Sequence, residues 1–298
     1  MITGSINQLN GFSLAQAKGK AYWELLKPRL SFLVAFSCAF GFVLATPRVD
    51  GIVLTMLFLG GFLLSGSSVI VNQIIEIDLD KLMVRTMKRP LPTDRLSIRE
   101  SVIFAILCFV VGVGILIIFT NWLTTSLSIL SMVLYSFVYT PLKRVGPIAV
   151  FVGAIPGALP PLLGWTAATG TISHEALIIF GIQFIWQFPH FWAIAWVSDD
   201  DYKKAGFKLL PSGGKKDLNT AIQIMIYTMF LIPMGMLPAT FGITGIKSAI
   251  VATVCGVLFF AATFSLMKSG DRKSALKIMF ASFLYLPIVQ IAYMLDKV

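Results

Sequence analysis

Nine apolar runs, each roughly 20 residues long, constrain the fold of this chain more than any other feature. A backbone can cross a lipid bilayer only where its N–H and C=O groups are satisfied internally, so such runs predict transmembrane helices. The chain is 57% hydrophobic and only 13% charged, and its mean hydropathy of +0.84 is far from that of a soluble domain. We therefore expect an all-α polytopic membrane protein with nine transmembrane helices.

The expected spans can be placed to within a few residues. The first is preceded by basic residues like a signal peptide, but it lacks a small-residue cleavage site and is followed at once by Pro47 and Arg48. We interpret it as a retained first helix. In chain order, the nine spans are 30–46, 52–72, 101–119, 123–139, 147–165, 175–197, 218–239, 248–267 and 275–295.

The distribution of Lys and Arg supports this number of spans, because short cytoplasmic loops are enriched in basic residues. With a cytoplasmic N-terminus, 21 of the 24 basic residues fall on the cytoplasmic side, against Arg48, Lys247 and Lys297 on the other. The C-terminus is then expected on the opposite side from the N-terminus. The net charge of +10 follows from this topology; it would also attract anionic membrane lipid, and it requires no nucleic acid.

The whole chain, 1–298, is expected to form one transmembrane domain preceded by a polar segment at 1–24. Its two longest polar connections, 76–100 and 198–217, follow the second and sixth spans and are therefore both expected on the cytoplasmic side. This spacing predicts two parallel four-helix repeats plus a ninth helix around a central cavity. Acidic clusters in the two connections are expected to face each other.

Small residues and prolines mark the fifth span, "GPIAVFVGAIPGALPPLLGW". Its prolines predict a kink, and Gly153 with Gly157 predicts close helix packing more than ligand contact. The three cysteines, Cys38, Cys108 and Cys255, lie inside apolar spans without a paired motif, so we expect free core residues.

The stretch "NQIIEIDLDKLMVRTMKRPLP" gathers acids and bases where the second span meets water. If the helix continues, Asn72, Glu76 and Asp80 recur at i, i+4 and i+8 and share one stripe, while Asp78 points elsewhere. Stacked carboxylates repel each other, and oxygen ligands sharing a phosphate suit Mg²⁺. On spacing alone, a solvated helix end with acids beside Lys81 is the simpler interpretation.

The basic residues that follow favour a binding site instead. Arg85, Lys88 and Arg89 precede Pro92 and offer donors suited to phosphate oxygens. The second loop, "VSDDDYKKAGFKLLP", repeats the combination with Asp201 before Lys203 and Lys204. Two such half-sites at one end of a bundle predict a diphosphate site, and a lipidic cavity behind it would accept an isoprenoid tail.

Of the two histidines, His190 is the candidate functional residue. It lies in "QFPHFW" near the end of the sixth span, where an ionisable side chain marks a functional site and neutral imidazole can bind heme iron. A hydrogen bond between helices explains its position equally well. His174, after Ser173 at the start of the same span, is interpreted as a solvated residue near an N-cap.

From about Leu25 onward, the chain resembles the protoheme IX farnesyltransferases (heme O synthases), which belong to the UbiA superfamily of intramembrane prenyltransferases. The matching stretches are "NQIIEIDLDKLMVRTMKRPLP", "YSFVYTPLKR", "GAIPGALPPLLGW", "WQFPHFWAIAW" and "DYKKAG" with "LLP". Three features depart from the family's pattern. Glu76 stands where Asp is usual in Asn-x-x-x-Asp-x-x-x-Asp, and Val197 replaces the first Asp of the second motif, leaving Asp201. Lys88 occupies a place that is often Asn, and Lys208 with Leu209 replaces a usual Pro-Met.

The resemblance implies transfer of a farnesyl group from farnesyl diphosphate to a vinyl group of protoheme IX (heme B), giving heme O, in a bacterial plasma (inner) membrane. It implies Mg²⁺ as cofactor and heme as a substrate, and heme A synthase or terminal oxidase assembly as downstream partners. The implied catalytic residues and metal ligands are Asn72, Glu76, Asp80 and Asp201, and the implied heme-binding residue is His190. The diphosphate-binding candidates are Arg85, Lys88, Arg89, Lys143, Lys203 and Lys204.

The electron-rich rings of Tyr135, Tyr139, Trp186 and Phe188 could stabilise an allylic cation, although such residues more often serve packing. Two alternative functions remain open from the sequence. One is a sister prenyltransferase that uses a quinone precursor or another aromatic acceptor. The other is a secondary transporter, against which the acids lie at one end of the bundle rather than at mid-membrane.

Overall fold

The computed structural model describes residues 11–298, and nine of their helices are long and apolar enough to cross a membrane, as predicted. They begin and end within four residues of the expected positions. In chain order, the spans are α2 (Pro28–Ala45), α3 (Gly51–Ile75), α5 (Ile98–Phe119), α6 to α7 (Trp122–Leu142), α8 (Ile148–Thr169), α9 (His174–Val197), α11 with α12 (Leu218–Thr240), α13 (Ile246–Ser269) and α14 (Arg272–Leu295).

Polar side chains begin most of these helices. An N-terminal helical N–H lacks an intrahelical partner, and a side-chain oxygen at the N-cap accepts its hydrogen. Ser97 does so with Glu100 in a capping box. Ser173 accepts from the N–H of Ala176 at the start of α9, which confirms the predicted cap. The others are Asp50, Asn121, Asp217 and Asp271.

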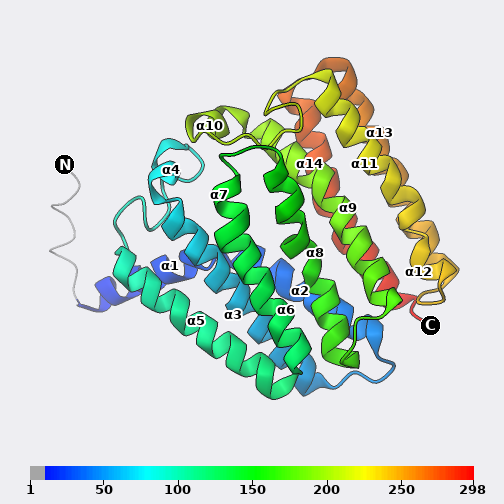
Figure 1. The fold of residues 1–298 in the computed structure, drawn as a ribbon, viewed down its shortest axis with the longest axis horizontal. Helices are drawn as coiled ribbons and strands as arrows, with labels where there is room; N and C mark the ends of the chain where they lie inside the picture. Colours follow the sequence, from blue (N-terminus) through cyan, green and yellow to red (C-terminus); the bar gives the residue numbers. More distant parts are fainter. Residues whose placement is uncertain (1–10) are drawn as a thin grey trace.

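Short helices lie at the ends of the spans. Helix α1 (Gly11–Leu25) occupies most of the segment expected to be polar and N-terminal, whose residues 1–10 lie outside the described part of the chain. Helices α4 (Ile77–Leu82) and α10 (Asp199–Lys204) lie at the same end of the bundle (Figure 1). The two acidic loops therefore meet at one end, as predicted.

Helices α2 and α8 approach each other very closely at two glycines. A Cβ added at Gly41 would come within 1.9 Å of the carbonyl oxygen of Pro161, and one at Gly164 within 1.9 Å of that of Cys38. Only glycine permits this backbone approach. Gly153 and Gly157, the predicted packing residues, instead contact the side chains of Tyr139 and Gln187.

Helix α8 continues through Pro156, Pro160 and Pro161, and side chains of α9 satisfy one of the carbonyl groups that these prolines free. Pro161 has no N–H to donate to Gly157, four residues earlier. Gln183 and Gln187 of α9 both donate to that carbonyl oxygen, at 2.8 and 2.9 Å. These two contacts therefore fix α9 against α8.

The cysteines follow the prediction. Cys38 and Cys108 are buried, Cys255 is partly buried, and all three are free.

Candidate active site

A cavity of about 570 Å³ opens between α2, α3, α8, α9 and α14. Most of its wall is apolar, but five ionisable residues gather where α3 ends. We call them the charged end of the cavity: Glu76, Asp80, Arg85, Arg89 and Lys143. A cavity with one charged end and an apolar body fits an amphipathic ligand whose polar group lies near the membrane surface.

The predicted stripe of polar residues on α3 and α4 is present. Helix α3 ends at Ile75 and α4 begins at Ile77, but the N–H of Glu76 donates to Asn72 and that of Asp80 to Glu76. Helical phase is therefore kept, and Asn72, Glu76 and Asp80 are all buried and line the cavity. Asp78 pairs with Lys81 and its side chain is 87% exposed, so it faces away as predicted.

Each carboxylate of the stripe is paired with a basic residue. Lys143 Nζ donates to both oxygens of Glu76, at 2.9 and 3.1 Å. Arg89 Nη1 donates to Asp80 Oδ2 at 2.6 Å. Both carboxylates and Lys143 are buried and Arg89 is partly buried, so each charge depends strongly on its partner. They also hold two cations beside the cavity.

Asp80 Oδ1 is buried and has no hydrogen-bond partner among the described residues. Asn72 donates its amide nitrogen to Thr140, which leaves the amide oxygen as a further acceptor. Oxygen atoms of this kind fit a hard cation such as Mg²⁺. Within residues 11–298, however, no three His, Cys, Asp or Glu side chains form a ready metal site. The donor set therefore fits a metal ion whose other ligands come from a phosphorylated substrate and water.

Lys143 lies directly after the membrane span, against the rings of Tyr139 (4.8 Å) and Phe207 (5.6 Å). Burial lowers the pKa of this lysine, although Glu76 acts in the opposite direction. The segment before it, Leu134–Tyr139, is a π-helical turn. Such turns often occur at functional sites, and this one brings Tyr135 and Tyr139 to the cavity wall.

Asp201 does not line the cavity. Its Oδ1 accepts from the N–H of Val84 at 3.1 Å, and its Oδ2 accepts from that of Arg85 at 3.2 Å. Burial would raise the pKa of Asp201, but these two hydrogen bonds lower it overall. The structure thus shows Asp201 holding the loop that carries Arg85, and its role as a metal ligand stays a prediction.

Three of the predicted diphosphate-binding lysines also lie outside the cavity wall. Lys203 pairs with Asp199 at 2.8 Å, and Lys204 lies 3.7 Å from Asp201. Lys88 is exposed. Arg85, Arg89 and Lys143 are the predicted basic residues that the fold brings to the cavity.

His190 lines the cavity from α9. Its Nδ1 lies 2.9 Å from Ser282 Oγ of α14, so the hydrogen bond between helices considered from the sequence is present. The cavity position also leaves the ring available to a ligand. His174 pairs with Glu175 and its side chain is 73% exposed, which confirms the predicted solvated position.

The four aromatic residues considered from the sequence separate into two groups. Tyr135, Tyr139 and Trp186 line the cavity. Phe188 instead packs between Trp192 and Tyr227, with ring centroids 5.4 and 4.6 Å away. Packing therefore accounts for Phe188, and of the four only the other three face the cavity.

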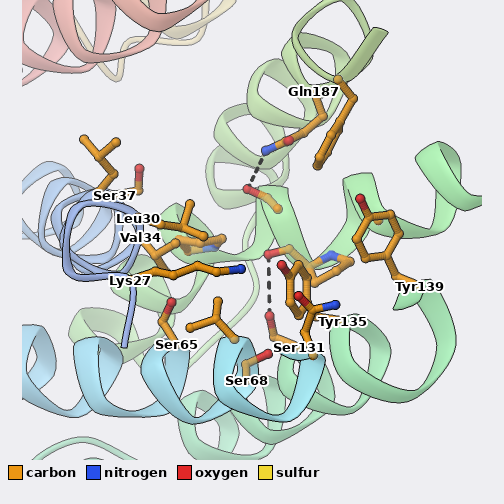
Figure 2. Close-up of a pocket in the computed structure, with 18 of the residues that line it drawn as sticks. Lys27, Leu30, Val34, Ser37, Ser65, Ser68, Ser131, Tyr135, Tyr139 and Gln187 are labelled. Carbon is orange, nitrogen blue, oxygen red and sulfur yellow. Dashed lines mark hydrogen bonds between the residues drawn. The ribbon is translucent and has the colours of Figure 1, made fainter. Parts of the chain in front are cut away.

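Lys27 is a cavity residue that the sequence analysis did not select. It precedes α2 with a left-handed φ of 45°, and its side chain extends toward Tyr135 (Figure 2). In the described part of the chain, no carboxylate lies within ion-pair distance of its ammonium group. Burial lowers its pKa well below the usual value, and Arg89 and Lys143 add to the effect. The sequence feature that could have pointed to Lys27 is its position directly before Pro28, the proline that starts the first span.

The model of the UbiA prenyltransferase family matches residues 34–286. The chain is 51% identical over 280 residues to a protein from Cytophaga hutchinsonii named protoheme IX farnesyltransferase, covering 94% of this chain and 98% of that protein. It is 37% identical to a mitochondrial protein of the same name from Arabidopsis thaliana, over 94% of this chain and 65% of that protein.

Solved structures show the same fold. One, from work on digeranylgeranylglyceryl phosphate synthase, has a TM-score of 0.77 at 19% identity and covers 94% of this chain and 98% of that one. Another, of a UbiA homolog from Archaeoglobus fulgidus bound to GPP and Mg²⁺, has a TM-score of 0.63 at 17% identity and covers 92% and 99%.

Proposed function

Because the chain belongs to the UbiA prenyltransferase family, we propose that it transfers a farnesyl group from farnesyl diphosphate to a vinyl group of protoheme IX. The bond between farnesyl C1 and oxygen breaks, and diphosphate leaves with the electron pair. C1 then bonds to the terminal vinyl carbon. Water adds at the carbon next to the porphyrin and loses a proton, which gives the hydroxyethylfarnesyl group of heme O.

The observation that carries the proposal is the 51% identity to the Cytophaga hutchinsonii protein over nearly the whole length of both chains. The cavity agrees with it, because a charged end for diphosphate opens into an apolar body for a farnesyl chain. The acids also lie at the end of the bundle rather than at mid-span, which favours this chemistry over transport.

Diphosphate is proposed to bind at the charged end of the cavity. Lys143 donates from a buried position and Arg89 from a partly buried one, and Arg85 donates from the loop that Asp201 holds. Donors fixed in advance stabilise negative charge as it develops on the leaving oxygen atoms. Lys27 adds a further amine at this cavity, which can donate to a phosphate oxygen.

Mg²⁺ is proposed to be held by Asp80 and Asn72, with Glu76 beside them, because Asp80 Oδ1 is a buried acceptor at the cavity without a partner among the residues that the structure describes. When bound, the ion would neutralise charge on the departing diphosphate. Asp201 is proposed to act by holding the Arg85 loop, and Lys88, Lys203 and Lys204 to attract anionic substrate from the surface.

The allylic cation requires a dry wall with electron-rich rings. Tyr135, Tyr139 and Trp186 line the cavity and can stabilise positive charge through their ring faces. Their proposed role is to protect the cation from water until the vinyl carbon reaches it. His190 is proposed to bind the heme iron.

The charge asymmetry supports a plasma membrane protein with its N-terminus and both loops in the cytoplasm. A cysteine introduced at Asp200 should then react with an impermeant thiol reagent only from the cytoplasmic side. Reaction from the other side would show that the orientation is the opposite of the one proposed.

Heme A synthase or terminal oxidase assembly proteins are proposed to receive the product. Crosslinking in membranes would reveal whether they contact this chain.

The deciding experiment supplies purified protein with protoheme, farnesyl diphosphate and Mg²⁺ and determines the mass of the pigment. The expected product is heme carrying one hydroxyethylfarnesyl group. A parallel reaction offers a quinone precursor as acceptor. If that acceptor is prenylated and heme is not, the chain is a prenyltransferase with a different acceptor.

Asp201→Asn should raise the KM for farnesyl diphosphate about tenfold, because an amide can accept from only one of the two N–H groups and the Arg85 loop loses a charged hydrogen bond. The Mg²⁺ concentration for half-maximal rate should stay unchanged. The exposed neighbour Asp200, changed to Asn, is the matched control. A higher Mg²⁺ requirement in Asp201→Asn would instead make Asp201 a metal ligand.

A further inference from the structure

The ring of His190 is held on several sides by helices α9 and α14. Trp186, one turn earlier on α9, stacks on it with centroids 4.3 Å apart and planes at 21°. The indole N–H of Trp186 donates to the backbone oxygen of Ser282 at 3.0 Å. Phe283 meets the ring edge-on at 5.2 Å. The imidazole therefore has one fixed orientation.

The hydroxyl group of Ser282 determines which ring nitrogen carries the proton. Ser282 Oγ lies 2.6 Å from the backbone oxygen of Met279 and 2.9 Å from His190 Nδ1. A carbonyl oxygen only accepts, so the single hydroxyl proton must go to Met279. Both contacts are hydrogen bonds only if Nδ1–H of His190 donates to Ser282 Oγ. In a neutral imidazole, Nε2 then has a free lone pair.

Nothing in residues 15–298 hydrogen-bonds to this Nε2 atom. The ring lines the cavity, and its neighbours are aromatic rather than acidic. A fixed imidazole with an uncommitted nitrogen beside a cavity is the arrangement expected of a metal ligand. Histidine ligands usually donate their other N–H to a neighbouring group, which fixes the tautomer and raises their basicity.

We propose that Ser282 is a positioning residue that holds His190 in the Nδ1–H tautomer, so that Nε2 binds the iron of the heme acceptor. The inference rests on the proposed function, in which the acceptor is an iron porphyrin. It assigns Ser282 a role through His190, with no contact to the reacting vinyl group, and it makes α14 part of the acceptor site.

The tautomer can be measured without heme. The chain has two histidines, so His174→Gln, a change at an exposed position outside the cavity, leaves His190 as the only one. In protein labelled with ¹⁵N-histidine, NMR should show a protonated Nδ1 and an unprotonated Nε2. Adding Ser282→Ala should remove this preference. A protonated Nε2 in the presence of Ser282 would overturn the inference and leave the heme reaction itself untouched.

Iron binding is measured on the same purified full-length protein. Ferrous heme should show an iron–histidine stretching band in resonance Raman spectra, and His190→Ala should abolish it. Ser282→Ala should shift the band to lower frequency and weaken heme binding about tenfold. Ser101→Ala, which removes a buried hydroxyl group that is not part of the cavity lining, is the control for folding and should change neither.

Metal-free protoporphyrin IX separates positioning from packing. Its affinity should be equal in the wild type and in Ser282→Ala, because no iron is present to use Nε2. If Ser282→Ala loses the same affinity for heme and for the metal-free porphyrin, Ser282 is a packing residue and the inference is wrong. Persistence of the iron–histidine band in His190→Ala would remove His190 as the ligand, whereas the pigment assay would still report farnesyl transfer.

Discussion

Asp80→Asn is expected to lower turnover by about 10³-fold, at the upper end of what one electrostatic group contributes to a transition state. The change keeps the shape of the side chain but removes the charge that pairs with Arg89 and the buried oxygen proposed for Mg²⁺. Steady-state kinetics with protoheme and farnesyl diphosphate measures the effect. Asp78→Asn, in the same helix but 87% exposed, should retain full activity.

The same variant tests the metal. If Asp80 binds Mg²⁺, the residual activity of Asp80→Asn should require a higher Mg²⁺ concentration than that of the wild type. Thorough chelation should stop the wild-type reaction, and added Mg²⁺ should restore it. Activity that survives chelation would exclude the metal from the mechanism, and full activity in Asp80→Asn would exclude this carboxylate.

Lys143→Met is expected to lower turnover about 10²-fold, because it removes a buried cation from the charged end of the cavity. It also leaves the Glu76 carboxylate buried without its partner, which costs about 3–5 kcal/mol of stability. The double variant Glu76→Gln with Lys143→Met removes both charges. It should unfold closer to the wild-type temperature and remain inactive. Recovery of activity together with stability would limit the pair to a structural role.

The pH dependence follows from the same lysine. The ammonium form binds diphosphate, and it is lost as pH rises through the pKa of Lys143. Burial lowers that pKa, so activity should fall at a lower pH than an exposed lysine would allow. Lys143→Arg keeps its charge at high pH and should move the alkaline limb upward. The exposed neighbour Arg144, changed to Met, should leave the profile unchanged.

The stripe of Asn72, Glu76 and Asp80 shows what local geometry can predict. Its positions follow from helical phase, which the hydrogen bonds through Glu76 preserve, and the exposure of Asp78 follows from the same phase. The positions of the basic residues could not be predicted in the same way. Arg85, Arg89 and Lys143 reach the cavity, whereas Lys88, Lys203 and Lys204 do not, because these positions depend on how each loop folds back.

Contacts between helices that are far apart in the sequence could not be predicted from the sequence alone. The approach of α2 and α8 at Gly41 and Gly164 requires knowing which helices are neighbours. The motif predicts that Asp201 is a metal ligand, and this stays a prediction; the structure adds that its carboxylate accepts from the first loop, 117 positions earlier at Val84. Ser282 gave no signal at all, because an isolated serine in an apolar span has meaning only beside His190.

The sequence by itself determined the nine spans, the meeting of the two acidic loops at one end and the polar stripe of α3. These depend on hydrophobic length, on loop parity and on the helical period, which are local properties of the chain. Tertiary structure alone decided which basic residues enter the cavity, what Asp201 holds and how His190 is oriented. Those outcomes depend on hydrogen bonds between helices far apart in sequence, and only the packed bundle brings their donors and acceptors within reach.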